Sequence, residues 1–160
     1  MFRLIPPPLH RLALKIAHRV RHKWRLLRKV PISGVTVIAS DAQGRVLLVR
    51  HSYGSGHWAL PGGGIKRGEE PQDAAHREMR EEVGCLIEQV ELFESFEEVI
   101  SGSRHTAYLV SARLQGELRP DMREVVEARV FEPASLPRPI GSLSRTRLER
   151  WQAQIGKDGS

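Results

Sequence analysis

Cysteine is almost absent from this chain of 160 residues, which contains a single one. One cysteine excludes an intramolecular disulfide framework and is typical of a reducing compartment, so we expect a cytoplasmic protein. The sequence also lacks any run of about 18 or more apolar residues, which excludes a transmembrane helix of ordinary length. Its first residues lack the continuous apolar core of a secretory signal peptide, so we expect none there.

Acidic residues are missing from the first 34 positions, which contain nine Lys and Arg residues. The net charge of +6 arises in this segment, because the rest of the chain has 16 basic and 19 acidic residues. The remaining length and composition are those of one ordinary soluble domain. We therefore predict a basic N-terminal arm at residues 1–33, one domain at residues 34–155 and a short tail at residues 156–160.

The basic arm is predicted to form an amphipathic helix. Three consecutive prolines at residues 6–8 form a stiff segment that a helix cannot contain. From about Leu9 to Arg28, apolar residues recur on one helical arc and basic residues lie mostly opposite. Pro31 ends the predicted helix.

Several interpretations of the arm stay open. Its apolar stripe could pack on the domain or on a second subunit, which would make a homodimer. A basic helix that contains Trp24 could instead lie on an anionic membrane surface, as in a peripheral membrane protein. Residues 9–29 could also follow the phosphate backbone of RNA. An Arg-rich start without acids is, in addition, typical of a mitochondrial transit segment.

The rest of the chain alternates between strand and helix patterns, which predicts an α/β fold with a mixed sheet. A β-branched strand, a turn and a return strand predict a hairpin at the start of the domain. A loop rich in glycine then leads into a helix. The expected strands are 34–39, 45–50, 86–96, 105–114 and 127–132, and the expected helices are 70–83 and 144–155.

The helix at residues 70–83 contains three glutamates at i, i+3 and i+4, namely Glu78, Glu81 and Glu82. This spacing predicts three carboxylates on one helical face, opposite a buried side. Like charges this close repel unless a cation lies among them. A hard divalent cation with oxygen ligands, Mg²⁺ or as a substitute Mn²⁺, fits such a cluster. The predicted buried side consists of Ala74, Ala75, Met79 and Val83.

Residues 63–85 read GGIKRGEEPQDAAHREMREEVGC. Gly63, Glu69, the pair Arg77-Glu78, the pair Glu81-Glu82 and Gly84 have the spacing of the Nudix box. The segment therefore resembles the signature of the Nudix hydrolase family. Its one departure is Cys85, at a position that is usually aliphatic, and cysteine is small and apolar enough to pack there.

The resemblance implies a Nudix α/β/α sandwich over about residues 34–154 and a Mg²⁺-dependent hydrolase. Its substrate would be a nucleoside diphosphate linked to another moiety, such as a nucleotide, a nucleotide sugar or a dinucleoside polyphosphate. The alternatives are an RNA 5′-end pyrophosphohydrolase that uses the basic arm, and a non-catalytic nucleotide-sensing module.

The resemblance also assigns roles to residues. Glu78, Glu81 and Glu82 would bind the metal, and Glu81, Glu82 and Glu124 are the catalytic candidates, with Glu97 and Glu98 as rivals of Glu124. Glu69 and Arg77 would be supporting residues. Independently of the resemblance, the expected substrate-binding residues are Arg50, Tyr53, Gly63 and Arg104, and Trp58 is expected in the core.

Overall fold

The computed structural model describes residues 32–100 and 102–158, so the predicted helix of the basic arm lies outside the described residues. Within this part no helix is long and apolar enough to cross a membrane. The strands are β1 (Ile32–Ser40), β2 (Val46–His51), β3 (Trp58–Ala59), β4 (Gly62–Gly64), β5 (Leu86–Ile100), β6 (Ser103–Gln115) and β7 (Val125–Phe131). The helices are α2 (Pro71–Glu78), the π-helical turn η1 (Met79–Val83) and α3 (Ser142–Asp158).

The strands form one mixed sheet around β1. The main path is β3-β2-β1-β6-β5, with β7 paired to β2 and β4 paired to β1. Strand β1 runs parallel to β6 and antiparallel to both β2 and β4. Its start pairs with the glycine strand, where Gly34 lies opposite Gly64, and its end pairs with β2, where Ser40 lies opposite Val46.

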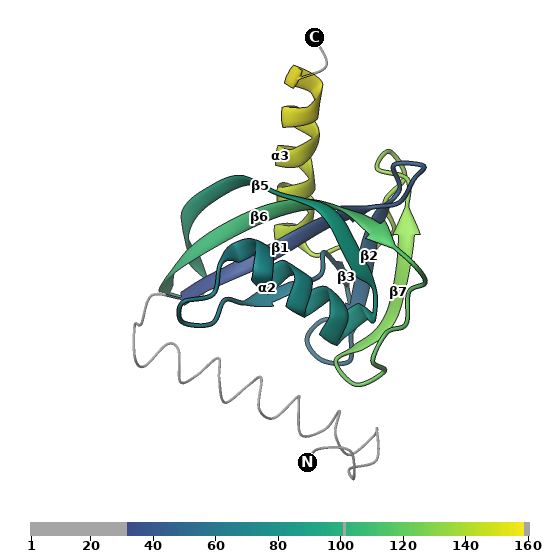
Figure 1. Ribbon diagram of the computed structural model, residues 1–160, viewed down its shortest axis with the longest axis horizontal. Helices are drawn as coiled ribbons and strands as arrows, with labels where there is room; N and C mark the ends of the chain where they lie inside the picture. Colours follow the sequence, from purple (N-terminus) through teal and green to yellow (C-terminus); the bar gives the residue numbers. More distant parts are fainter. Residues whose placement is uncertain (1–31, 101, 159–160) are drawn as a thin grey trace.

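Side chains of β1 alternate between two hydrophobic cores, one on each face of the sheet. Val35 and Val37 pack on one face, in the core that also contains the buried side of α2 and η1. These two segments, residues 71–83, together form the box helix. Ile38 packs on the other face with Leu148 of α3. Figure 1 shows α2 in front of the sheet and α3 extending behind and beyond it. The predicted α/β/α sandwich is thus confirmed.

The predicted strands are present, with different lengths. The hairpin of β1 and β2 is confirmed, and its turn is fixed by the carboxylate of Asp41, which accepts the backbone N–H of Gln43 and of Arg45. Strand β5 is longer than expected because its pairing with β6 continues to Ile100, opposite Ser103, and two bulges interrupt that pairing nearer its start. The short strands β3 and β4 were not predicted.

The box helix changes type before its end. Pro71 lies in its first turn, where a missing N–H costs nothing. After Glu78 the helix widens into η1, in which the N–H of Gly84 donates to the carbonyl of Met79, five residues earlier. A continuous α-helix over residues 70–83 was therefore a wrong prediction in detail, because one π turn interrupts it. Such turns are frequent at functional sites.

Candidate metal and active site

The glycine turn of β4 brings backbone into direct contact with the box carboxylates. A side chain on Gly63 would place its Cβ 2.5 Å from the carboxyl carbon of Glu78. Gly62 has φ +149, and a Cβ there would overlap the carbonyl oxygen of Val35. Glycine at both positions therefore lets the strand lie against β1 on one side and against Glu78 on the other.

Glu82 is the most deeply buried carboxylate of the cluster, with 5 % of its surface exposed. It accepts a hydrogen bond from the backbone N–H of Gly62. Its Oε2 is buried and has no hydrogen-bond partner within the described part of the chain. Burial above all, and then the charges of Glu78 and Glu124, raise the pKa of Glu82 to about 8.

Glu78 lies beside it and is 9 % exposed. Burial raises the pKa of Glu78 as well, while the guanidinium of Arg77 opposes that rise. Arg77 Nη1 donates to Glu78 Oε1 at 2.6 Å. The same guanidinium donates to both carboxylate oxygens of Glu69, at 2.7 and 2.8 Å, and to the carbonyl of Gly64 at 2.9 Å. Arg77 thereby ties the glycine turn, the loop and the box helix together.

Glu69 is correspondingly fixed at the start of the helix. Hydrogen bonding to Arg77 lowers the pKa of Glu69 to about 2, and its carboxylate also accepts the backbone N–H of Lys66. Both residues thus have the geometry expected of supporting residues, since they orient Glu78 without belonging to the buried carboxylate pair.

Glu81 is the most exposed of the three box glutamates, and its charge adds to the raised pKa of Glu78. Its side chain is 61 % exposed and lies 3.6 Å from Arg77 Nη1. The π turn that begins at Met79 changes the angular spacing that an α-helix would give. The glutamates were expected opposite the apolar side of the helix, and there Glu78 and Glu82 are buried against the glycine turn rather than open to solvent.

Glu124, in the loop that precedes β7, lies near the same cluster. Its charge contributes to the raised pKa of both Glu78 and Glu82. The loop that carries it is fixed by Asp121, whose carboxylate accepts the backbone N–H of Glu124 at 3.0 Å and of Val125 at 2.9 Å. Backbone hydrogen bonds also join the loop to the box helix, including one from Asp121 N–H to Glu82 O at 3.1 Å.

Asp121 is a site residue that the sequence analysis missed. Its charge adds to the rise in the pKa of Glu82, and its side chain orders the loop that positions Glu124. An aspartate whose carboxylate bonds backbone N–H groups two to four residues later is a recognisable turn signal, and it could have been found in the sequence PDMRE. The rivals Glu97 and Glu98 bond elsewhere, to Thr106 and to Arg147.

The predicted substrate-binding residues are not all close together. Gly63 borders the carboxylates, as described. Arg50 pairs with Glu127 at 3.1 Å and lies over the ring of Trp58, 5.7 Å from its centroid. Tyr53 lies in the loop after β2, and Arg104 is exposed on β6. Trp58 is buried in the core, as expected.

A divalent cation fits this donor set. Two buried carboxylates that repel each other, a third at Glu124 and an unpartnered oxygen at Glu82 together favour a positive charge between them. Among the described residues, however, no three acidic, histidine or cysteine side chains already converge as a metal site. Arg77 Nη1 lies 2.6 Å from Glu78 Oε1 and 3.6 Å from Glu81 Oε2, so a cation would have to draw at least one of these carboxylates away from the guanidinium.

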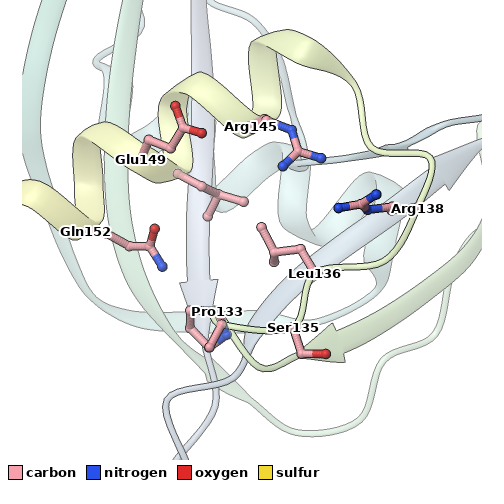
Figure 2. Close-up of a pocket in the computed structure, with 9 residues that line it drawn as sticks. Pro133, Ser135, Leu136, Arg138, Arg145, Glu149 and Gln152 are labelled. Carbon is pink, nitrogen blue, oxygen red and sulfur yellow. The ribbon is translucent and has the colours of Figure 1, made fainter.

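A separate cavity of about 410 Å³ lies between α3 and the segment that precedes it (Figure 2). Arg138 and Arg145 contribute guanidinium groups to it, and Leu148 also lines it. None of the box glutamates lines it, so we do not assign it to the carboxylate site.

Known proteins share both the sequence pattern and this fold. The family model for the NUDIX domain matches residues 30–153. The chain is 29 % identical over 140 residues to the NAD-capped RNA hydrolase NudC of Vibrio cholerae, covering 86 % of this chain and 52 % of that protein. It is 45 % identical over 58 residues to an RNA pyrophosphohydrolase of Saccharophagus degradans, covering 36 % and 34 %. The chain thus spans about half or less of the length of these relatives.

Solved structures of other proteins have the same fold. A MutT NUDIX hydrolase from Burkholderia pseudomallei superposes with a TM-score of 0.67 at 27 % identity, covering 75 % of this chain and 97 % of that one. A MutT protein from Methanosarcina mazei has the same TM-score of 0.67 at 20 % identity, covering 80 % and 97 %, and supports the fold alone. With the box intact in sequence and folded as a helix against a glycine turn, the chain belongs to the Nudix hydrolase family.

Proposed function

We propose that this protein is a Mg²⁺-dependent hydrolase that splits the phosphoanhydride bond of a nucleoside diphosphate linked to another moiety. The observation that carries the proposal is the buried, unpartnered Oε2 of Glu82, which lies in a cluster with Glu78 and Glu124. An isolated carboxylate cluster of this kind costs folding free energy, so a charge-balancing ligand accounts for its presence. Membership of the family and the complete box support the same function.

The metal would be held by Glu78 and Glu82, with Glu81 turning inward from its exposed position. A bound divalent cation neutralises charge on the phosphoryl oxygens and lowers the pKa of a bound water. Mn²⁺ is the expected substitute, because it prefers the same oxygen ligands. Arg77 holds Glu78 in place through the hydrogen bonds described above, so it acts on orientation rather than on the substrate.

The proton of the attacking water needs an acceptor, and Glu124 is our candidate for it. It lies close enough to Glu78 and Glu82 for its charge to affect both of their pKa values. It is also carried by a loop that Asp121 orders, which would keep it at a fixed position. Water would form a new bond to one phosphorus as the bridging P–O bond breaks, and the proton would pass to Glu124.

A substrate screen tests this function. Purified full-length protein would be incubated with nucleoside triphosphates, ADP-ribose, other nucleotide sugars, dinucleoside polyphosphates and triphosphorylated RNA, with MgCl₂ or with EDTA. We expect one substrate class to be hydrolysed far faster than the others, and only with the metal. Products formed in ¹⁸O-labelled water would identify the phosphorus attacked. Equal rates with MgCl₂ and EDTA would contradict the proposal.

A second candidate, hydrolysis at the 5′ end of RNA, is favoured by the relatives whose names refer to capped RNA or to RNA pyrophosphohydrolysis. The nine basic residues in the first 34 would supply the contact to the phosphate backbone. In that case affinity for triphosphorylated RNA should fall steeply with salt, and deleting residues 1–31 should remove most of that salt dependence. Equal salt dependence in both proteins would argue against this role for the arm.

Other uses of the arm, as well as the cytoplasmic location, stay predictions. Gel filtration of the full chain and of the deletion would detect a homodimer that depends on residues 9–29. Co-sedimentation with anionic vesicles would detect binding to a membrane surface. The sensing module stays a rival only if the screen finds metal binding without hydrolysis.

A further inference from the structure

One face of the sheet has exposed apolar side chains where β5 and β6 extend past α2 (Figure 1). Val99 is 71 % exposed and Leu92 is 39 % exposed. Tyr108 of β6 lines a groove together with Leu92, and it pairs with Ser95. Val99 follows Ser95 by four residues along the strand, so both lie on the same side of the sheet as Tyr108. We call the surface formed by Leu92, Val99 and Tyr108 the open face.

The other side of the same strand is covered by α3. The guanidinium of Arg150 lies over the ring of Phe96, 4.5 Å from its centroid, and Arg147 pairs with Glu98. Strand β5 thus has apolar residues on both sides, at Phe96 under α3 and on the open face. A strand with one side in water normally alternates apolar and polar residues, whereas apolar residues on both sides are typical of a strand that is covered twice. The open face therefore has the composition of a surface that another element covers.

A groove of about 800 Å³ joins the open face to the loop before α2. Ile65 and Pro71 line it together with Leu92 and Tyr108. Ser33, the second residue of β1, lines it as well. Pockets that enclose drug-sized ligands measure about 300–1,000 Å³, so this groove has room for several side chains.

Charge does not select a small ion for this groove. The charged side chains that line it are Lys66, Arg67, Glu69 and Glu70. Glu69 is already bonded to Arg77. Two basic and two acidic residues favour neither a phosphate nor a metal cation, whereas apolar side chains could fill the space between them. An amphipathic helix is the kind of element that supplies such side chains.

The basic arm joins the domain beside this surface. Ile32 begins β1 and pairs with His105 of β6, which in turn pairs with Glu98 of β5. Neighbouring strands lie about 5 Å apart, so the chain enters the sheet about 10 Å from the strand that carries most of the open face. Only residues 29–31 separate this point from the predicted helix, and connections of about two to six residues between a helix and a strand are common.

The predicted helix of the arm also fits in length and in its apolar side. Residues 9–28 would span about 30 Å as a helix, and residues 92–99 of β5 span roughly 23 Å. The apolar stripe of the arm includes, near the end that meets the sheet, Val20, Trp24 and Leu27. Packing of such a stripe is the usual source of stability for a helix in a protein.

We propose that the apolar stripe of residues 9–28 packs on the open face and in its groove, within the same chain. The arm would then form an outer layer beside α2 at this end of the sheet. Its basic side would stay in water, where the RNA contact of the second candidate function would need it. The docked helix would lie against the loop that carries Glu69, next to the metal site but outside it. Docking of the arm does not depend on the proposed hydrolysis.

Labelling of engineered cysteines tests this docking in the full-length protein. Leu92→Cys and Val99→Cys report on the open face, and Leu86→Cys, at the exposed start of β5, is the matched control. Each would be measured with the natural arm and with an arm that carries Val20→Asp and Leu27→Asp. The measured quantity is the labelling rate with N-ethylmaleimide in the altered arm divided by that in the natural arm. This ratio cancels the intrinsic reactivity of each thiol.

The expected ratio is about ten or more for Leu92→Cys and Val99→Cys, because an arm that is docked about ten times as often as open slows labelling about tenfold. It should be near one for Leu86→Cys. The natural Cys85 is 1 % exposed, so the protein without an added cysteine should react slowly and supplies the background rate. An arm that carries His22→Asp instead, on its basic side, should leave all ratios near one.

Three results would overturn the proposal. The first is a ratio near one at both open-face positions. The second is an equal increase at Leu86→Cys, which would indicate a general loosening of the domain. The third is a ratio that falls when the protein is diluted about a hundredfold, because it would assign the open face to a second copy of the chain. A ratio of about ten that is confined to the open face and independent of concentration would support docking within one chain.

Discussion

The buried carboxyl of Glu82 should make the metal-free protein less stable as the pH rises from about 5 to 8. In the folded state its pKa is about 8, against an ordinary value of 4.5. Between these values the folded chain keeps a proton that the unfolded chain has already lost. Unfolding then releases a proton, so each rise in pH favours the unfolded state.

The size of this effect follows from the two pKa values of about 8 and 4.5. At about 1.36 kcal/mol for each pH unit between them, the largest possible loss is roughly 5 kcal/mol. Rotation of the side chain toward water would reduce the loss, because it would relieve the burial that causes the shift. Added Mg²⁺ should flatten the pH dependence, since a cation stabilises the charged carboxylates that higher pH produces.

Urea unfolding followed by tryptophan fluorescence measures this directly. The wild type and Glu82→Gln would be compared from pH 5 to pH 8, in EDTA and in MgCl₂. In EDTA, Glu82→Gln should gain stability relative to the wild type as the pH rises, by about 2–5 kcal/mol over the range. The control Glu91→Gln, at an exposed position of β5, should follow the wild type. A difference between wild type and Glu82→Gln that stays constant with pH would refute the reasoning.

Three further predictions concern the same cluster. Gly63→Ala should push the carboxylate of Glu78 away and weaken Mg²⁺ binding about tenfold or more by calorimetry, whereas Gly64→Ala, which meets nothing within 4 Å, should not. Arg77→Met should lower the free energy of unfolding, measured in urea, by about 1–3 kcal/mol, because it leaves buried acceptors unpaired. Unchanged stability would contradict a stabilising role for the Arg77 hydrogen bonds. Glu124→Gln should lower kcat about 10²–10⁴-fold while Mg²⁺ affinity changes less, and a normal kcat would exclude it as the base.

Much of the site could be predicted because the box fixes its geometry locally. Glycine, glutamate and arginine at set intervals determine a turn, a helix and the hydrogen bonds that join them. Arg77 donates hydrogen bonds to both Glu69 and Glu78. The strand and helix order also followed from periodicity. The change of helix type could not be predicted, because the π turn at Met79–Val83 has no periodic signature in the sequence.

Other features depend on long-range contacts that a single sequence does not display. Asp121 acts through backbone hydrogen bonds to the end of the box helix. Arg147 bonds Thr36, which is 111 positions earlier in the chain, so this contact could not be inferred from spacing. Strands of two and three residues, such as β3 and β4, are too short to show an alternating pattern.

The measurement that tests the central claim most directly is the Mg²⁺-dependent turnover of Glu82→Gln. Its kcat would be compared with those of the wild type and of Glu91→Gln, on the best substrate of the screen and at saturating metal. We predict a loss of about 10²-fold or more for Glu82→Gln, with a circular dichroism spectrum like that of the wild type and no loss for Glu91→Gln. Near-normal turnover of a folded Glu82→Gln protein would contradict catalysis at this carboxylate cluster.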